Sequence, residues 1–190
     1  MGTRDTGIAA QRQGPLRERY RRVPADAWIN DGAHTIDACD EDPFHGSVVP
    51  ANGGNVPLRF GVHRSVGGFH DHPNPGDLLS AALAACFDST LRIVADHLGI
   101  RLRSLVVEVT AECDVRGCLQ VEPEVPVGFQ RMRCRVRLQP GNAIDENKAR
   151  MLVTVAENCC VVLQTLRNGV TVEAEVDSRP SLSASAAAPV

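Results

Sequence analysis

The stretch NPGDLLSAALAACFDSTLRIVADHLGI, residues 74–100, decides the fold of this chain. Its apolar residues recur at three- and four-residue spacing, as on one face of an amphipathic helix. Asn74 suits an N-cap, Pro75 the first helical position and Gly99 the residue after the end. The pattern therefore predicts a helix from about Pro75 to about His97. Its apolar stripe consists of Leu79, Leu83, Cys86, Phe87, Thr90, Leu91 and Val94.

Two strands, a second helix and a last strand are predicted after this segment. Residues 104–115 and 129–138 alternate apolar and polar side chains, the period of a half-buried strand. The outward arginines of the second strand can pair with outward glutamates of the first, and this interpretation is favoured over a nucleic-acid groove. Cys113 and Cys134 fall on the inward faces and are predicted to be core. Residues 145–168 predict one long helix, and residues 170–176 a strand with Glu173 and Glu175 outward.

The segments before residue 74 are less regular. Residues 14–27 predict a short charged helix that is entered after Gly14 and Pro15, is closed by Pro24 and lies as an arm on the body. The region from Ala27 to Val66 predicts two or three strands, and the following glycine- and proline-rich residues a loop. Strands interleaved with two apolar helices indicate an α+β domain in which each helix covers a sheet face.

Composition limits the class of protein. The chain has 190 residues and a formal net charge of −3, which argues against a partner that presents phosphates or an anionic membrane. The richest apolar run, residues 78–87, is shorter than the roughly 20 residues of a membrane helix, and the N-terminus lacks the apolar core of a secretory signal. Seven cysteines, an odd number, favour a reduced, cytoplasmic setting.

The cysteines are the candidate chemical groups. Cys86 lies among alanines, and Ala156 lies one turn before Cys160, so two closely packed helices could bring one cysteine each within disulfide reach. The alternative is that these cysteines are buried apolar filler. Cys159 and Cys160 both fit the apolar side of the second helix, and spacing alone does not choose between them. A further alternative is a metal site built from His70 and His72 with Cys86.

Residues 74–100, followed by a strand and then by AENCCVVLQTLRNGVTVEAEV at residues 156–176, resemble the OsmC/Ohr family of thiol peroxidases. The resemblance covers about Arg59 to Val176. It implies an OsmC-like α+β fold, with two long central helices packed on antiparallel sheets in an intertwined homodimer. The chain then divides into a charged N-terminal arm at 1–26, an OsmC-like domain at 27–177 and a disordered tail at 178–190.

The resemblance also implies the site. Cys86 corresponds to the peroxidatic cysteine and Cys160 to the resolving cysteine, with Cys159 as a neighbour. Arg64 corresponds to the arginine that faces the thiolate, with Arg59 as the fallback. The implied substrate-binding residues are Phe87, Leu83 and Asp77, and no metal is implied.

The implied function is reduction of organic hydroperoxides in oxidative stress defence. No cofactor is bound, and an external dithiol, often a lipoylated protein in the family, restores the thiols. Two residues depart from the family pattern: Gly76 stands where a glutamate holds the arginine, with Asp77 one position on, and Val161 replaces a proline. These departures favour an alternative hypothesis, an OsmC-like protein of weak activity that binds a small apolar ligand or senses oxidants.

Overall fold

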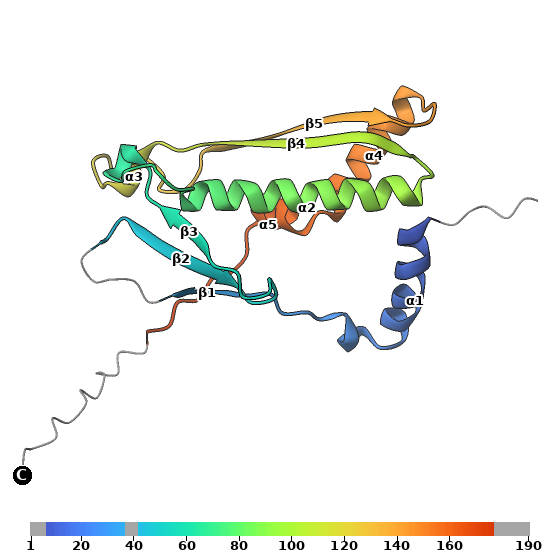
Figure 1. Ribbon diagram of the computed structural model, residues 1–190, viewed down its shortest axis with the longest axis horizontal. Helices are drawn as coiled ribbons and strands as arrows, with labels where there is room; N and C mark the ends of the chain where they lie inside the picture. The colour runs from blue at the N-terminus through green and yellow to red at the C-terminus, as the bar shows by residue number, and fades with distance from the viewer. Residues whose placement is uncertain (1–6, 37–41, 177–190) are drawn as a thin grey trace, which may run out of the picture.

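The computed structural model describes residues 7–36 and 42–176 (Figure 1). The helical elements are α1 (Ile8–Arg22), η1 (Pro24–Ala27), η2 (Arg64–Val66), α2 (Pro75–His97), α3 (Val115–Cys118), α4 (Glu146–Cys159) and α5 (Val161–Asn168). The strands are β1 (Ala33–Ile36), β2 (His45–Pro50), β3 (Leu58–Gly61), β4 (Leu102–Glu112) and β5 (Arg131–Pro140). The residues before 7, from 37 to 41 and after 176, which include Cys39 and the predicted tail, lie outside the described residues.

Helix α2 is the long axis of the molecule and has the predicted bounds. The Asn74 side chain accepts hydrogen bonds from the backbone N–H groups of Gly76 and Asp77, and the Asp77 carboxylate accepts one from the Asn74 N–H at 2.9 Å. This reciprocal capping box satisfies N–H groups that the first turn of a helix leaves free. Gly99 follows the helix with φ of +64°, a conformation that costs glycine little.

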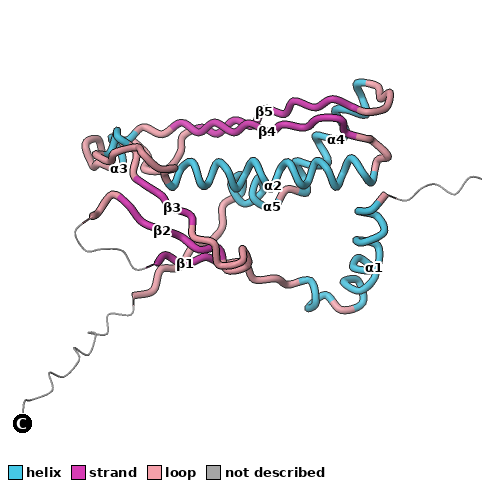
Figure 2. The backbone as a smooth tube through the Cα atoms, viewed as in Figure 1, coloured by secondary structure: helices cyan, strands magenta, loops and turns pink. Residues whose placement is uncertain are grey.

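The antiparallel pair β4–β5 runs along α2, as Figures 1 and 2 show. The alternation predicted for both strands is confirmed, because the inward residues of both strands pack against one apolar core. Helices α2, α4 and α5 all cover this inward face. The buried residues of the core are Leu83, Phe87, Leu91, Val94, Ala95, Ile100, Leu105, Leu152, Ala156, Cys160 and Leu163.

The outward face of β4–β5 carries the predicted charge pairs. Arg137 binds both carboxylate oxygens of Glu108, at 2.7 and 2.6 Å. Arg131 lies 3.8 Å from Glu112. Two of the four outward arginines, Arg131 and Arg137, thus face acidic side chains of the neighbouring strand, as the cross-strand interpretation expects, whereas no ion pair of Arg133 or Arg135 is among the described interactions.

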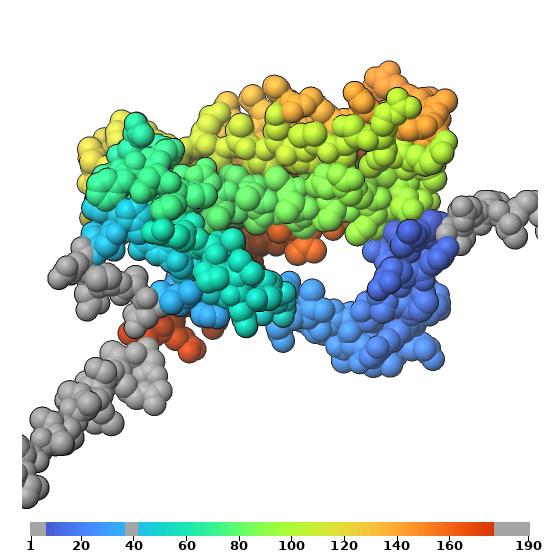
Figure 3. Space-filling model, viewed as in Figure 1, coloured from blue at the N-terminus to red at the C-terminus, as the bar shows by residue number. Residues whose placement is uncertain are grey.

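Strands β1, β2 and β3 form a separate antiparallel sheet that makes no extensive contact with any helix in the described part of the chain. Val49 is its one buried hydrophobic residue among those described. Figure 3 shows this sheet beside the body, with open space between the body and the segment that joins α1 to β1. Ile36, Leu58 and Phe69 expose 43%, 45% and 64% of their surface, so apolar side chains lie uncovered here.

Three sequence-based predictions for the ends of the chain and for α2 need correction. Residues 170–176 form no strand, because no neighbouring strand pairs with them in the described chain. Helix α1 begins at Ile8 rather than after Pro15, and it ends before Pro24 as predicted. The arm contacts the body through the Ala9 N–H, which donates to the Asp96 carboxylate at 2.8 Å.

The third correction concerns the prediction that the apolar runs of the chain are too short for a membrane helix. Measured over a window of 18 residues instead of over uninterrupted apolar runs, α2 is long and apolar enough to cross a membrane, with a mean hydropathy of 1.5 in that window. Helices α4 and α5 pass the same test only together and are bent by 67° at their junction. A core helix passes this test too, and five α2 residues are buried in the core described above. The remaining apolar surface of α2, including Leu79 and Ile93, is partly exposed.

A histidine fastens the sheet β1–β3 to the loop that leads into α2. His45 Nδ1 lies 2.6 Å from the Asp42 carboxylate and Nε2 lies 2.9 Å from the Asp71 carboxylate. The ring stacks on Phe69 at 5.5 Å and meets the edge of the His72 ring at 5.7 Å. Both nitrogens face acceptors, so the doubly protonated ring fits best. The hydrogen bond to Asp71 is the largest cause that raises the pKa of His45, followed by that to Asp42.

This arrangement predicts a pH-dependent loop. A raised pKa means that the charged histidine stabilises the fold fully below about pH 6.5, and that this contribution is lost as the pH rises through the folded-state value. Limited proteolysis within residues 67–73, with each rate divided by that of the unfolded chain at the same pH, should accelerate between pH 6 and pH 9. His45→Gln should be cleaved quickly at both pH values. An identical pH profile for the two proteins would contradict this role.

The core makes a prediction about stability. Leu152 is fully buried, whereas its neighbour Met151 exposes 52% of its surface. Leu152→Ala should lower the free energy of unfolding by about 3 kcal/mol, because it removes apolar contacts and leaves a cavity. Met151→Ala should cost less than about 1 kcal/mol. Urea unfolding at one fixed protein concentration measures both, and equal losses would place the core elsewhere.

Candidate functional site

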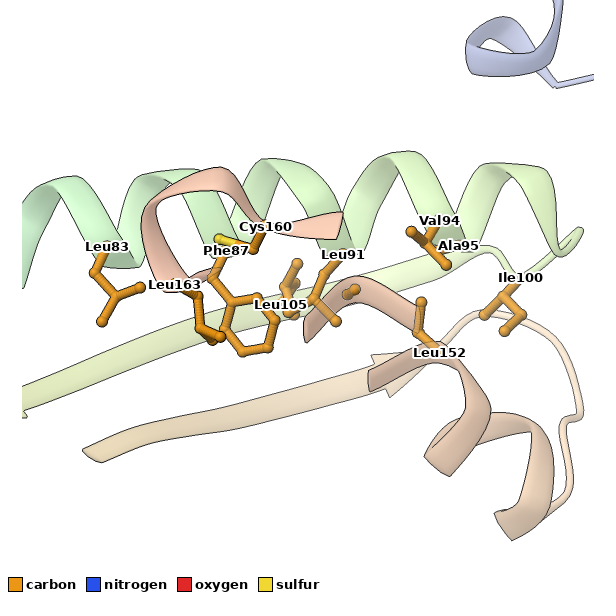
Figure 4. Packing of buried hydrophobic residues seen from close by; sticks show 11 residues of the cluster. Leu83, Phe87, Leu91, Val94, Ala95, Ile100, Leu105, Leu152, Cys160 and Leu163 are labelled. Atoms are coloured by element: carbon orange, nitrogen blue, oxygen red, sulfur yellow. The ribbon is translucent and has the colours of Figure 1, made fainter. Parts of the chain in front are cut away.

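Two cysteines far apart in the sequence meet at the centre of the helical layer. The Cys160 thiol lies 3.4 Å from Cys86 Sγ and is oriented to donate a hydrogen bond to it. Cys86 comes from the middle of α2, and Cys160 from the junction of α4 and α5. Figure 4 shows the Cys160 side chain directed at α2, alongside Phe87. A disulfide bond is about 2.05 Å long, so a small movement would allow the two sulfurs to bond.

The predicted second long helix is broken at Cys160. This residue has φ of −78° and ψ of 110°, ends α4 and begins α5, and the two helices are bent by 67°. The prediction of one continuous helix from 145 to 168 was therefore wrong, although its two ends are right. At this bend the Cys160 sulfur approaches Cys86, while the preceding residue Cys159 is exposed.

The two central thiols differ in environment. Cys160 is fully buried, whereas Cys86 is half-buried. Burial raises the pKa of the Cys160 thiol, and proximity to Cys86 raises it further, while the Leu163 N–H and the Thr90 hydroxyl oppose the shift. Cys160 is therefore held as a neutral thiol at neutral pH. A neutral thiol is a hydrogen-bond donor, so Cys160 can donate to the Cys86 sulfur.

Two hydroxyl groups brace the Cys86 backbone. The carbonyl of Cys86 accepts hydrogen bonds from Thr90 Oγ1 at 2.7 Å and from Ser89 Oγ at 3.0 Å. Thr90 also influences Cys160, as its effect on that pKa shows. Thr90 thus links the backbone of one cysteine to the thiol of the other.

A cavity of about 780 Å³ lies between α2, β5, α4 and α5, and neither Cys86 nor Cys160 is among the described residues that line it. The proposed substrate residues Leu83 and Phe87 line it, together with Leu163 of α5, and its lining is mostly apolar. Glu157 and Arg167 lie at it as an ion pair, 3.0 Å apart. The cavity has the size and polarity of a site for a small organic molecule.

The other predicted site residues lie apart from this pair. Asp77 caps α2 and lines a different cavity of about 790 Å³ at the start of that helix. Arg64 is exposed in η2, and Arg59 is exposed in β3. Neither arginine makes a hydrogen bond to Cys86 among the described interactions.

The remaining thiols and histidines of the described residues do not form a candidate metal site. No group of three potential ligands is present within residues 7–36 and 42–176. His70 packs its ring against His63 at 4.5 Å, not against Cys86. Cys134 packs against the core as predicted, but Cys113 is exposed just after the end of β4, so the prediction that it is core was wrong.

Comparison with protein families identifies the family to which this sequence is similar. The sequence model of the OsmC-like protein family matches residues 68–175, more than half of the chain. The matched range includes α2, the broken helix and both central cysteines. The chain belongs to the OsmC-like protein family. A search of curated proteins returned no significant match.

Solved structures share the OsmC-like fold. An OsmC-like protein from Mycoplasma pneumoniae superposes with a TM-score of 0.59 at 13% identity, over 74% of this chain and 89% of the other. An organic hydroperoxide resistance protein OsmC from Legionella pneumophila gives 0.55 at 24% identity, over 75% and 92%. One from Elizabethkingia anophelis gives 0.55 at 22% identity, over 75% and 91%. At these identities the likeness establishes the fold alone.

Sequence reasoning missed the side chains that bridge the bend of this OsmC-like chain. Gln164 and Arg167 of α5 both bind Glu157 of α4. Seven and ten residues separate these partners, spacings that do not meet on a continuous helix. No periodic signal in the sequence could have found them.

The difference in exposure predicts a difference in reactivity. In the reduced protein, iodoacetamide should modify Cys159 well before Cys160, because Cys160 is both buried and held as a neutral thiol. Peptide mapping by mass spectrometry after timed quenching measures the two sites separately. After unfolding in urea the two cysteines should react alike. Equal rates in the folded protein would contradict the burial of Cys160.

Proposed function

We propose that this chain is a cysteine-based peroxidase that reduces organic hydroperoxides and serves in oxidative stress defence. The observation that carries the proposal is the 3.4 Å contact between Cys86 Sγ and the Cys160 thiol. Two thiols held at this distance across two helices match the needs of a peroxidatic and a resolving cysteine. Membership of the OsmC-like family and the printed names of the Legionella and Elizabethkingia proteins support the choice of organic hydroperoxides.

The chemistry follows from the two thiol environments. A thiolate at Cys86 attacks the distal oxygen of the hydroperoxide, the O–O bond breaks, and the alcohol leaves after taking up a proton. Cys86 is then a sulfenic acid, which condenses with the Cys160 thiol to a disulfide and releases water. An external dithiol reduces this disulfide by exchange and is itself oxidised to a disulfide. No bound cofactor takes part in these steps.

The apolar cavity suits the organic part of such a substrate. Leu83 and Phe87, which flank Cys86 in the sequence, line it, and burial of an alkyl or aryl group there is favourable because it removes apolar surface from water. Hydrogen peroxide has no such group to bury. The cavity therefore favours organic hydroperoxides over hydrogen peroxide.

The proposed active form is a homodimer. Sheet β1–β3 and the partly exposed face of α2 leave apolar side chains uncovered, as a second copy of the chain would require. Arg64 is exposed and makes neither an ion pair nor a hydrogen bond to Cys86 among the described residues. We therefore assign the cation that faces Cys86 to Arg64 of the partner subunit.

Turnover of hydroperoxide tests the proposed activity. With an organic hydroperoxide and a dithiol reductant, the parent protein and Cys159→Ser should both turn over, whereas Cys86→Ser and Cys160→Ser should lose dithiol-supported turnover. Loss of the resolving thiol should also expose Cys86 to over-oxidation, visible by mass. An inert parent protein would favour the alternative, a ligand-binding or oxidant-sensing member, which the engagement of Asp77 in capping also motivates.

Subunit complementation tests the position of the arginine. Arg64→Met and Cys86→Ser should each be inactive as homodimers. Co-expressed with different affinity tags and purified as a mixed dimer, they should recover up to half of the parental rate, because one site then holds both Cys86 and an arginine from the other chain. A mixed dimer without activity would show that Arg64 acts within its own chain, and an active Arg64→Met homodimer would show that it has no role. Arg59→Met in place of Arg64→Met tests the fallback arginine by the same complementation.

A further inference from the structure

The bend at Cys160 forms without proline, the residue type that most often bends a helix. Proline at the first position of a helix fixes its own φ, lacks an N–H and keeps the preceding residue extended. Here that position holds Val161, whose N–H would allow α4 to continue into α5 as one straight helix. Some other interaction must therefore keep the helix bent.

The Glu157 carbonyl is the group that decides between a bent and a straight helix. In a continuous helix it would accept the N–H of Val161, four residues on. In the bent structure Gln164 Nε2 takes that place and donates to the Glu157 carbonyl at 2.7 Å. The carbonyl freed by the break is thus satisfied by a side chain of α5, so the bend costs less than an unpaired carbonyl would.

The side chain of Glu157 is also bound by α5. Its carboxylate lies 3.0 Å from Arg167 of α5, so the backbone and the side chain of one α4 residue are both bound from across the bend. The Asn168 amide donates to Gln164 Oε1 at 3.1 Å. That contact turns the Gln164 amide so that its NH₂ group, not its oxygen, faces the Glu157 carbonyl.

We propose that Gln164, assisted by Arg167, is a positioning residue that holds the α4–α5 bend and thereby places Cys160 within reach of Cys86. It acts through the backbone conformation of Cys160 and makes no hydrogen bond to either sulfur among the described interactions. This inference rests on the proposed function only in naming disulfide formation as the step that it serves. The geometric claim concerns the Cys86–Cys160 pair itself.

The test measures the disulfide apart from peroxide chemistry. Reduced protein is oxidised by diamide, an azo compound that takes two electrons and two protons from the two thiols, and the Cys86–Cys160 bond is followed by peptide mapping. In Gln164→Leu its rate should fall about tenfold, since one hydrogen bond no longer favours the bent form. The equilibrium against a dithiothreitol redox buffer should shift by about tenfold as well, or about 30 mV.

Rescue separates positioning from general damage. Val161→Pro in the Gln164→Leu background should restore the parental rate and potential, because proline removes the competing N–H and prefers an extended Cys160, which is the conformation already present. Arg167→Met should show a smaller loss in the same direction. Arg150→Met, which removes an ion pair within α4 alone, should leave both quantities unchanged.

The outcomes are decisive. A parental rate and potential in Gln164→Leu, or a loss that Val161→Pro does not repair, would overturn the inference. If Gln164→Leu does not fold by circular dichroism, the Arg167→Met comparison with Arg150→Met decides it by the same two readouts. A parent protein that forms the disulfide with diamide but consumes no hydroperoxide would refute the proposed peroxidase and leave the positioning role intact.

Discussion

The contact between Cys86 and Cys160 depends on one constraint, the break in the second long helix. The bend gives Cys160 an extended backbone, buries its side chain and leaves Cys159 in solvent. The raised pKa of Cys160, its proximity to Cys86 and the choice between the two adjacent cysteines all follow from this break.

Helix α2 and the β4–β5 pair could be predicted from the sequence because their signals are local. The Asn74 cap, the proline after it and the glycine beyond His97 are all read within a few residues of the helix ends. The alternation of residues 104–112 and 131–138 likewise needs no knowledge of the rest of the chain. The resemblance to OsmC-like proteins, carried by the cysteine segments, supplied the pairing that spacing alone left open.

The sequence-based predictions that were wrong failed for a different physical reason. Residues 170–176 alternate as a strand should, but a strand forms only where another strand supplies hydrogen-bond partners, and none pairs with them in the described chain. The break at Cys160 is held by side chains seven and ten residues apart, which meet only after the helix has bent. Cys113 has the right parity for the core but lies one residue beyond the end of β4.

Direct mapping of the linked thiols after a single turnover tests the central claim. The reduced protein is mixed with one equivalent of an organic hydroperoxide without reductant, quenched in acid, alkylated and analysed by peptide mass spectrometry. The account predicts one new disulfide, between Cys86 and Cys160, with Cys159 still free for alkylation. A Cys86–Cys159 linkage, or oxidation confined to other cysteines, would contradict the assignment of this pair.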